Sequence, residues 1–567
     1  MAGSVAVVEL RVLDGPNLYF PRPAIKLTLG VDGWLRASET AAGRAAERLG
    51  VSGAGSPGAP GSEHRVRVVA RAGAHLTRRL AAATGVHRLA VRARPGPEPG
   101  QIVVAFPWRR RGSSEALARA VGRAMGDVLR RSPDRVVAEL ASLVASADPG
   151  PEPTVPDPVT PVVQITGTNG KTTTTRLLAH IVTAAGERVA YCSTDGVYRD
   201  GRRVKRGDYS GFGGAAAALA QRPDVAVLET ARGGILLRGI GVLHNDVAVV
   251  TNVQADHLDL HGIHTVDQLA EVKATITRIT RPGGWDVLNA DDPRVLSMRR
   301  HIGGRLWVYA LDHDHPAIRE TLRDGGRATT VIDGKIAWLE DHAVHPLADV
   351  TRVPITLAGL SSIYTSNALA AASAALAIGL PQRAVTRGLR SFVLDPETNP
   401  GRANLFELDG RVVVVDYAHN EDGMTGLTEI LRGLRAPGAE IWLAICTAGD
   451  RTDDILHGFA FRAAVGADHL AIADLRHYTR GRTAQEIYER LADAAAEAGV
   501  VDIPRYVGEL HALSAMLERS RPRDVVSVTA LGMRAKIFRW LAGHGARRLG
   551  PADVRRLVRR ASAGPTR

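Results

Sequence analysis

Short apolar runs bounded by turn residues alternate with longer amphipathic segments along most of the chain. In the middle part, four such runs occupy residues 162–165, 225–228, 247–250 and 285–288. Continuous apolar runs of this length are typical of strands buried on both faces, and the segments between them have helical spacing. We therefore predict a doubly wound α/β domain over residues 162–395.

The two ends of the chain show related patterns. Towards the C-terminus, apolar runs occupy residues 412–415, 441–445, 469–472 and 525–528. Their alternation with helical segments predicts a smaller Rossmann-like domain over residues 396–567. Near the N-terminus, the expected strands are residues 5–12, 25–29, 64–70 and 102–106, and the expected helices are residues 114–130 and 134–145. Residues 1–148 are thus predicted to form a small α+β domain.

A proline-rich segment separates the first two predicted domains. Six prolines fall within residues 149–161. This composition favours a stiff, extended linker. Three domains of ordinary size fit the length of 567 residues.

The chain is basic, with a formal net charge of +13. No aromatic-interleaved basic surface accompanies the charge, so we favour a solvated Arg-rich surface over nucleic-acid binding. No run is long enough to cross a bilayer, and the N-terminus lacks the pattern of a secretory signal, so no membrane partner is expected. Cys192 and Cys446 lie in apolar runs and are expected to be core thiols, which fits a cytoplasmic location.

The strongest chemical signal follows the first central strand. It is the loop Gly167, Thr168, Asn169, Gly170, Lys171, Thr172 and Thr173, before a helix expected over residues 172–185. Glycines let backbone N–H groups converge on a phosphate, and a helix N-terminus favours anions. Lys171 can reach terminal phosphates, and the Thr172 hydroxyl can bind Mg²⁺. The general pattern is incomplete because its first glycine falls on Ile165, but strand, turn and helix in this order predict a nucleotide site.

Further candidates follow other strands. Glu229 closes the run 225–228, where a carboxylate beside a phosphate loop is well placed for Mg²⁺. His257 and His261 are four apart, a spacing that would suit a metal pair on a helix. Because the segment follows a strand directly and Gly262 interrupts it, we favour a single histidine near Mg²⁺ over zinc ligation. Lys273 lies on a helix expected over residues 266–280, where a solvated side chain is the ordinary case.

Taken in order, these motifs resemble the Mur ligase superfamily. The other matching positions are Glu229-Thr230, Asp256-His257, Lys273, Asn289 to Asp292, Asn367 and Asp416 to Asn420. Within the superfamily, residues 228–236 and 400–406 are similar to the Mur-type half of the cyanophycin synthetases. Residues 13–17 resemble the N-terminal domain of that family more weakly. The resemblance spans about residues 161–540, and the order of the motifs makes it specific.

The resemblance implies an ATP-dependent ligase that joins a carboxylate to an amine through an acyl-phosphate, with ATP and Mg²⁺ as cofactors. Thr172, Glu229, His257 and a carbamylated Lys273 would hold metal. The residues expected to carry catalysis are Lys171, Glu229, His257, Lys273 and Arg402.

The same resemblance implies a nucleotide-binding role for three residues outside the phosphate loop. Asn367, at the start of a helix over residues 367–378, would lie on the adenine side. Arg402 would reach the phosphates from the hinge between domains. Asp416 would lie near the ribose. Residues 448–452 are a candidate position for the amine substrate, and residues 480–483 for an anionic one.

One departure limits the expected activity. Cyanophycin synthetases carry an ATP-grasp domain between their N-terminal and Mur-type parts, whereas residues 149–161 join these parts directly here. At most one ligation is therefore expected, on an amino acid or a peptide-like substrate, by a homo-oligomer. The alternatives are a glutamate ligase resembling folylpolyglutamate synthases and a nucleotide-binding scaffold without catalysis. Retention of Lys171, Glu229 and Lys273 argues against the scaffold.

Overall fold

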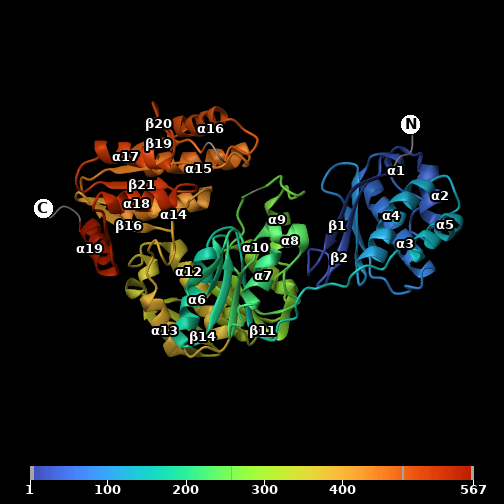
Figure 1. Ribbon diagram of the computed structural model, residues 1–567, viewed down its shortest axis with the longest axis horizontal. Helices are drawn as coiled ribbons and strands as arrows, with labels where there is room; N and C mark the ends of the chain where they lie inside the picture. Colours follow the sequence, from blue (N-terminus) through green and yellow to red (C-terminus); the bar gives the residue numbers. More distant parts are fainter. Residues whose placement is uncertain (1–4, 257, 476–477, 564–567) are drawn as a thin grey trace.

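Three separate sheets contain all the strands of the described residues (Figure 1). The computed structural model describes residues 5–256, 258–475 and 478–563. The predicted boundaries at residues 148, 161 and 395 fall between these sheets. Among the described residues, no helix combines the length and apolar character needed to span a bilayer.

The first sheet is antiparallel, with strand order β1-β2-β4-β3. Its strands are β1 (Ala6–Leu13), β2 (Ala24–Gly30), β3 (Arg92–Pro95) and β4 (Gln101–Pro107). Helices α3 (Glu63–Ala83) and α4 (Arg111–Asp127) pack on it, α1 (Asp32–Arg36) and α2 (Glu39–Arg48) pack on α3, and α5 (Pro133–Ala145) packs on α3 and α4. Alternate strand residues and one face of each long helix bury a common core, in which Trp34 and Trp108 are the largest apolar side chains.

The central sheet has strand order β15-β14-β13-β12-β11-β10-β5-β9-β6-β7-β8. Its strands are β5 (Val162–Thr166), β6 (Val189–Ser193), β7 (Gly196–Arg199), β8 (Arg202–Arg206), β9 (Val225–Glu229), β10 (Asn245–Val250), β11 (Thr280–Asn289), β12 (Arg305–Asp312), β13 (Arg327–Ile332), β14 (Lys335–Glu340) and β15 (Ala343–Asp349). Within this order, the strands from β13 through β5 to β6 pair in parallel. The outer strands β14 and β15 at one edge, and β7 and β8 at the other, are joined by antiparallel pairings. Parallel strands buried on both faces explain the continuous apolar runs in this part of the sequence.

Helices cover both faces of this sheet. They are α6 (Lys171–Ala185), α7 (Phe212–Leu219), α8 (Arg232–Arg238), α9 (Val266–Lys273), α10 (Pro293–Ser297), α11 (Pro316–Arg323), α12 (Ser362–Ala377) and α13 (Gln382–Ser391). Strand β5 lies between β10 and β9: the chain runs from β5 to β6 on one side of it, and later crosses from β9 to β10 on its other side. The carboxyl ends of strands at such a switch point form the usual ligand crevice of an open α/β sheet.

The third sheet has strand order β20-β19-β18-β21-β17-β16-β22. Its strands are β16 (Asn404–Leu408), β17 (Arg411–Asp416), β18 (Ile441–Ile445), β19 (His469–Ala473), β20 (Arg505–Tyr506), β21 (Val525–Thr529) and β22 (Arg547–Arg548). Its helices are α14 (Glu421–Leu434), α15 (Asp453–Gly466), α16 (Ala484–Glu497), α17 (Glu509–Arg519), α18 (Arg534–Gly543) and α19 (Pro551–Ser562). The α/β class predicted for the central and C-terminal parts is therefore confirmed, and Cys192 and Cys446 are free and buried.

The N-terminal and central units share a hydrophobic core. Leu13, Phe20 and Val103 pack in one buried cluster with residues of β9, β10 and α8. The turn 14–17 contacts the end of α8 directly: the N–H of Asp14 donates to the Arg238 carbonyl at 2.8 Å. Gly15 must be glycine because a Cβ there would lie 1.8 Å from the Ile240 carbonyl oxygen.

Three local predictions are wrong. Residues 64–70, expected to be a strand, lie in α3, where the Ser62 hydroxyl accepts from the Arg65 N–H and caps the helix. The helix expected over residues 266–280 ends at Lys273, because the chain must turn to start β11 at Thr280. The helix expected to begin at Asn367 begins at Ser362, capped by Ser361.

Candidate active site

The glycine loop after β5 folds closely against two neighbouring elements. Gly167 has a φ of 151°, and a Cβ there would lie 1.8 Å from the Thr251 hydroxyl. Gly170 has a φ of 86°, and a Cβ there would lie 2.2 Å from the Asn367 amide oxygen. Both positions therefore require glycine, for conformation and for space. Asn367 lies in the second turn of α12 and closes one side of the loop.

A buried carboxylate lies opposite the start of α6. Strand β9 ends at Glu229, which is 2% exposed, and its Oε2 accepts a 2.9 Å hydrogen bond from the Thr172 hydroxyl. The other oxygen, Oε1, is buried without a hydrogen-bond partner among the described residues. Burial raises the pKa of Glu229, and the nearby Lys171 charge opposes this rise. A buried oxygen without a partner is costly unless something cationic or protic occupies the space beside it.

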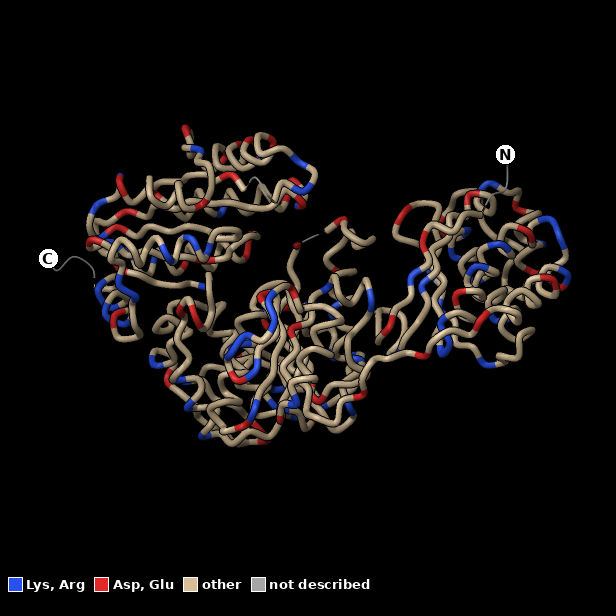
Figure 2. The backbone as a smooth tube through the Cα atoms, viewed as in Figure 1, with Lys and Arg blue, Asp and Glu red and all other residues tan. Residues whose placement is uncertain are grey.

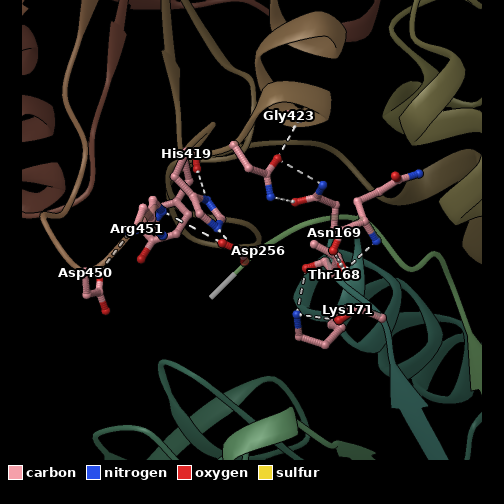
Figure 3. Close-up of polar contacts among 12 residues, drawn as sticks. Thr168, Asn169, Lys171, Asp256, His419, Gly423, Asp450 and Arg451 are labelled. Carbon is pink, nitrogen blue, oxygen red and sulfur yellow. Dashed lines mark hydrogen bonds and ion pairs between the residues drawn. The ribbon is translucent and has the colours of Figure 1, made fainter. Parts of the chain in front are cut away.

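Two lysines converge on the same loop. The Lys171 ammonium donates to the carbonyls of Gly167 at 3.0 Å and Thr168 at 2.9 Å (Figure 3). Lys273, 3% exposed at the end of α9, donates to the Gly167 carbonyl at 2.6 Å. Burial lowers the pKa of Lys171, and burial together with the Lys171 charge holds the pKa of Lys273 well below its usual range. Phosphate oxygens would compete with these carbonyls for the Lys171 ammonium.

On the C-terminal side of the cleft, Asp416 is held by its neighbours. Its Oδ2 accepts from the Ala403 N–H at 2.7 Å, and its Oδ1 accepts from the Ala418 N–H at 2.7 Å. Burial raises the pKa of Asp416, while Arg402 opposes the rise. The Arg402 guanidinium lies over the Tyr417 ring, 4.1 Å from its centroid. These contacts hold in place the segment that joins α13 to the C-terminal sheet.

Charged side chains bridge the cleft at its outer end. Asp256, beyond β10, lies 3.6 Å from His419 Nε2 and 3.8 Å from Arg451 Nε (Figure 3). Arg451 and Arg480 in turn both contact Asp450, at 3.0 and 2.6 Å. Residues 450, 451 and 480, which the sequence offered as two separate candidate positions, thus lie in contact with one another.

The cleft has a volume of about 450 Å³ and is lined by almost all the predicted site residues. These are Gly167, Thr168, Asn169, Gly170, Lys171, Thr172, Thr173, Glu229, Lys273, Asn367, Arg402 and Asp416. His257 lies outside the described residues. Residue 261 is described and has a φ of 58°, so the segment around it is not the helix that a histidine pair would need.

The structure also adds residues that sequence reasoning missed. Asp208 and Ser210 line the cleft, and Asp208 Oδ1 accepts from both the N–H and the hydroxyl of Ser210. The local sequence of Asp208 and Ser210, an acidic residue two positions before a serine, is typical of such a turn. Asp195 pairs with Arg176 at 2.9 Å and with Arg534 at 3.0 Å, which links the central and C-terminal domains.

The residues 289–292 take a structural role in this arrangement. The Asn289 side chain donates to the Thr251 carbonyl at 2.8 Å, and Asp292 Oδ2 accepts from the Val253 N–H at 2.7 Å. Asp292 also caps α10 through the N–H groups of Arg294 and Val295. This segment supports the loop after β10.

Sequence comparison identifies relatives of the central and C-terminal parts. A cyanophycin synthetase from Synechocystis sp. is 38% identical over 331 residues, which cover 58% of this chain and 38% of that protein. One from Geminocystis herdmanii is 36% identical over 347 residues, which cover 60% and 39% of the two chains. The chain therefore spans less than two fifths of the length of these curated relatives.

Structural comparison gives the same fold. The structure of E. coli FolC in complex with DHPP and ADP matches with a TM-score of 0.51 at 21% identity, covering 69% of this chain and 91% of FolC. Residues 165–375 match the family model of the Mur ligase middle domain. Residues 401–532 match that of the Mur ligase glutamate ligase domain. Through these two consecutive domains, the chain belongs to the Mur ligase family.

Proposed function

We propose that the protein is an ATP-dependent carboxylate–amine ligase that forms an amide or peptide bond. The observation that carries this proposal is the buried Glu229 carboxylate, which faces the Thr172 hydroxyl at the end of the glycine loop and keeps one oxygen without a partner. A kinase or an ATPase could share the loop. The relationship to Mur ligase domains supports the ligase.

The proposed reaction has two steps. The γ-phosphoryl group of ATP passes to an oxygen of the acid substrate, giving ADP and an acyl-phosphate. The amine nitrogen then attacks the acyl carbon, phosphate leaves, and the amine loses a proton as the amide forms. Amides of the loop and the Lys171 ammonium would stabilise charge on the transferring phosphoryl group, and Arg402 would approach it from the hinge.

The residues present fit Mg²⁺. Glu229 Oε1 and the Thr172 hydroxyl are hard oxygen donors of the kind Mg²⁺ prefers, and they lie beside the phosphate loop. Bound there, the ion would supply positive charge against the phosphates. The solved structure of a bifunctional folylpolyglutamate synthase/dihydrofolate synthase was obtained with Mn and AMPPNP bound, and matches this chain with a TM-score of 0.50 at 20% identity.

We also propose that Lys273 carries a carbamate. Its lowered pKa favours the neutral amine, which is the form that attacks CO₂. The nitrogen lone pair of the neutral amine bonds to the carbon of CO₂ and one proton is released, so that a neutral group becomes an anion; counted from the ammonium form, two protons leave. This anion would lie beside the Lys171 ammonium and would remove the repulsion between the two lysines.

As the substrate that is activated, we propose an amino acid or a peptide-like acid. The relatives named cyanophycin synthetase support this class of substrate. We propose one ATP site, in the cleft described above. Asp450, which lines the cleft, is the proposed position of the amine substrate, and Arg480 beside it that of an anionic one. The cytoplasmic location and the homo-oligomer stay predictions.

Phosphate release with ATP, Mg²⁺ and a panel of amino acids and dipeptides tests the proposal. We expect release that depends on two substrates and disappears in Lys171→Ala, while Lys335→Ala, an exposed residue of β14, behaves as wild type. Once the acid is found, labelling its carboxylate with ¹⁸O should transfer label into phosphate. Release without label transfer would exclude the acyl-phosphate, and an unchanged rate in Lys171→Ala would exclude the site.

A further inference from the structure

A second cavity lies between the N-terminal sheet and α9, and it shares no lining residue with the cleft described above. Its volume is about 470 Å³. Helix α3, strand β3, the segment after β1 and helix α9 form its walls. The ionisable lining side chains are Tyr19, Arg71, His75, Arg78, Arg92, Arg94 and Glu271.

The cavity carries a strong excess of positive charge. Glu271 is the only carboxylate among the described residues that line it, against four arginines. Arg278 adds a further cation beside it: burial and the charges of Arg92 and Arg94 lower its pKa, while Glu271 opposes this. Burial, together with Arg78 and Arg71, likewise lowers the pKa of His75. Mutual repulsion of this kind is relieved when an anion binds.

Two of the arginines are held in place by aromatic rings. The Arg92 guanidinium lies 5.2 Å from the centroid of the Phe20 ring, and that of Arg94 lies 5.1 Å from the Tyr19 ring. These contacts reduce the freedom that the arginines would lose on binding a ligand. The planar guanidinium fork suits bidentate contact with phosphate or carboxylate. Figure 2 shows Lys and Arg gathered along the N-terminal sheet where it approaches the central unit.

We propose that this cavity binds a small ligand with at least two negative charges, of phosphate or carboxylate type. Arg94 pairs with Glu271 at 3.1 Å, and each side chain is 41% exposed, so an anion can reach Arg94 and compete with Glu271. Glu271 lies two positions before Lys273 on α9. A ligand that takes the place of Glu271 at Arg94 would therefore break a contact of α9, the helix that places Lys273 in the cleft.

Titration calorimetry of the whole protein with inorganic pyrophosphate and with citrate tests the site. The double variant Arg92→Gln/Arg94→Gln should bind the preferred probe more weakly by about tenfold or more, because two charge-assisted contacts are lost. The matched control is Arg383→Gln/Arg387→Gln, which removes the same charge from exposed positions on α13. Equal affinities in the two double variants would overturn the proposal, as would a wild type that binds neither probe.

Hydrogen exchange gives a second measurement that does not depend on ligase activity. The bound probe should slow exchange in residues 71–78 of α3 and in β3, in wild type and in Lys171→Ala alike. Protection confined to residues 167–173 would place the anion in the ATP cleft and overturn the proposal. Tighter pyrophosphate assigns a phosphate ligand and tighter citrate a carboxylate. Because Lys171 lines the ATP cleft and does not line this cavity, this inference and the proposed function can fail separately.

Discussion

Asn169 and Asn420 exchange two hydrogen bonds across the cleft, each 3.1 Å long (Figure 3). Asn169 belongs to the phosphate loop, and Asn420 precedes α14 in the C-terminal domain. The Asn420 side chain also caps α14 by accepting from the Gly423 N–H at 2.9 Å. One amide thus joins the nucleotide loop to the first helix of the neighbouring domain.

Replacing Asn420 by Ser should weaken this connection. Serine keeps an oxygen that can cap α14 but is too short to exchange amide bonds with Asn169. We expect a larger radius of gyration in solution scattering without nucleotide. A double-mutant cycle with Asn169→Ala should give a coupling free energy of about 1–2 kcal/mol for unfolding. The variant Asn420→Asp can still cap α14 and still accept a hydrogen bond from Asn169, so its radius of gyration should lie between those of Asn420→Ser and the wild type. Zero coupling would show that the amide pair does not join the domains.

Two buried glutamates should respond differently to the same substitution. Glu229→Gln removes a charge beside the phosphate loop, so phosphate release should fall by about 100-fold or more. The melting temperature should hold or rise, because burial already penalises the Glu229 carboxylate.

Glu509 is the matched comparison because its oxygens accept from the N–H groups of Leu531, Gly532 and Met533. Glu509→Gln should therefore destabilise the protein by about 1–3 kcal/mol in denaturant unfolding. A large loss of stability in Glu229→Gln would instead show that Glu229 is mainly structural.

Lys273 should show carbamate chemistry. With ¹³C-bicarbonate, the wild type should give a carbamate signal in ¹³C NMR that is absent in Lys273→Ala and present in Lys335→Ala. Activity should fall in bicarbonate-free buffer and recover when bicarbonate is added. A wild-type rate insensitive to bicarbonate, with no carbamate signal, would leave Lys273 as a plain lysine.

Asp286 should make stability depend on pH near neutrality. Burial raises its pKa to about 7, against the hydrogen bonds it accepts from Thr280 and Gly304. The folded pKa exceeds the unfolded one, so the unfolded state holds fewer protons between about pH 4 and 7. Stability due to this group is therefore greatest below pH 4, declines as pH rises to 7, and is constant above.

The variant Asp286→Asn cannot ionise and should lack this decline. Measured by denaturant unfolding at pH 5 and pH 8, its stability relative to wild type should improve with pH by an amount on the order of a few kcal/mol. Asp333→Asn, in an exposed turn, should show no such trend. Parallel pH profiles for Asp286→Asn and wild type would contradict the raised pKa.

The sequence was most informative where a local pattern had one physical solution. The apolar run before Gly167 could only be a buried strand, and the glycines after it could only serve a tight loop. The segment 64–70 was ambiguous, because alternating Arg and Val fit a strand and also one face of a helix. The helix is stabilised by contacts outside the segment: the Arg65 guanidinium is fully buried and donates to the carbonyls of Trp34, Ala37 and Gly58.

The site residues also differ in how far their local sequence predicts them. Lys171 and Thr172 follow from the loop itself, whereas Lys273 and Arg402 rested on the family resemblance because nothing local distinguishes them. Asp195 could not be predicted at all. Its partners Arg176 and Arg534 come from two different domains, so only the folded chain shows the contact.

The shared core beneath Leu13 and Phe20 makes the first two units depend on each other for stability. Where an interface is continuous with a core, its two sides should unfold in one cooperative transition rather than one after the other. Calorimetry should accordingly show a single endotherm for residues 1 to about 395. Cutting the chain within residues 149–161 should leave the halves associated, because the joining peptide contributes less than the apolar surface on either side of it.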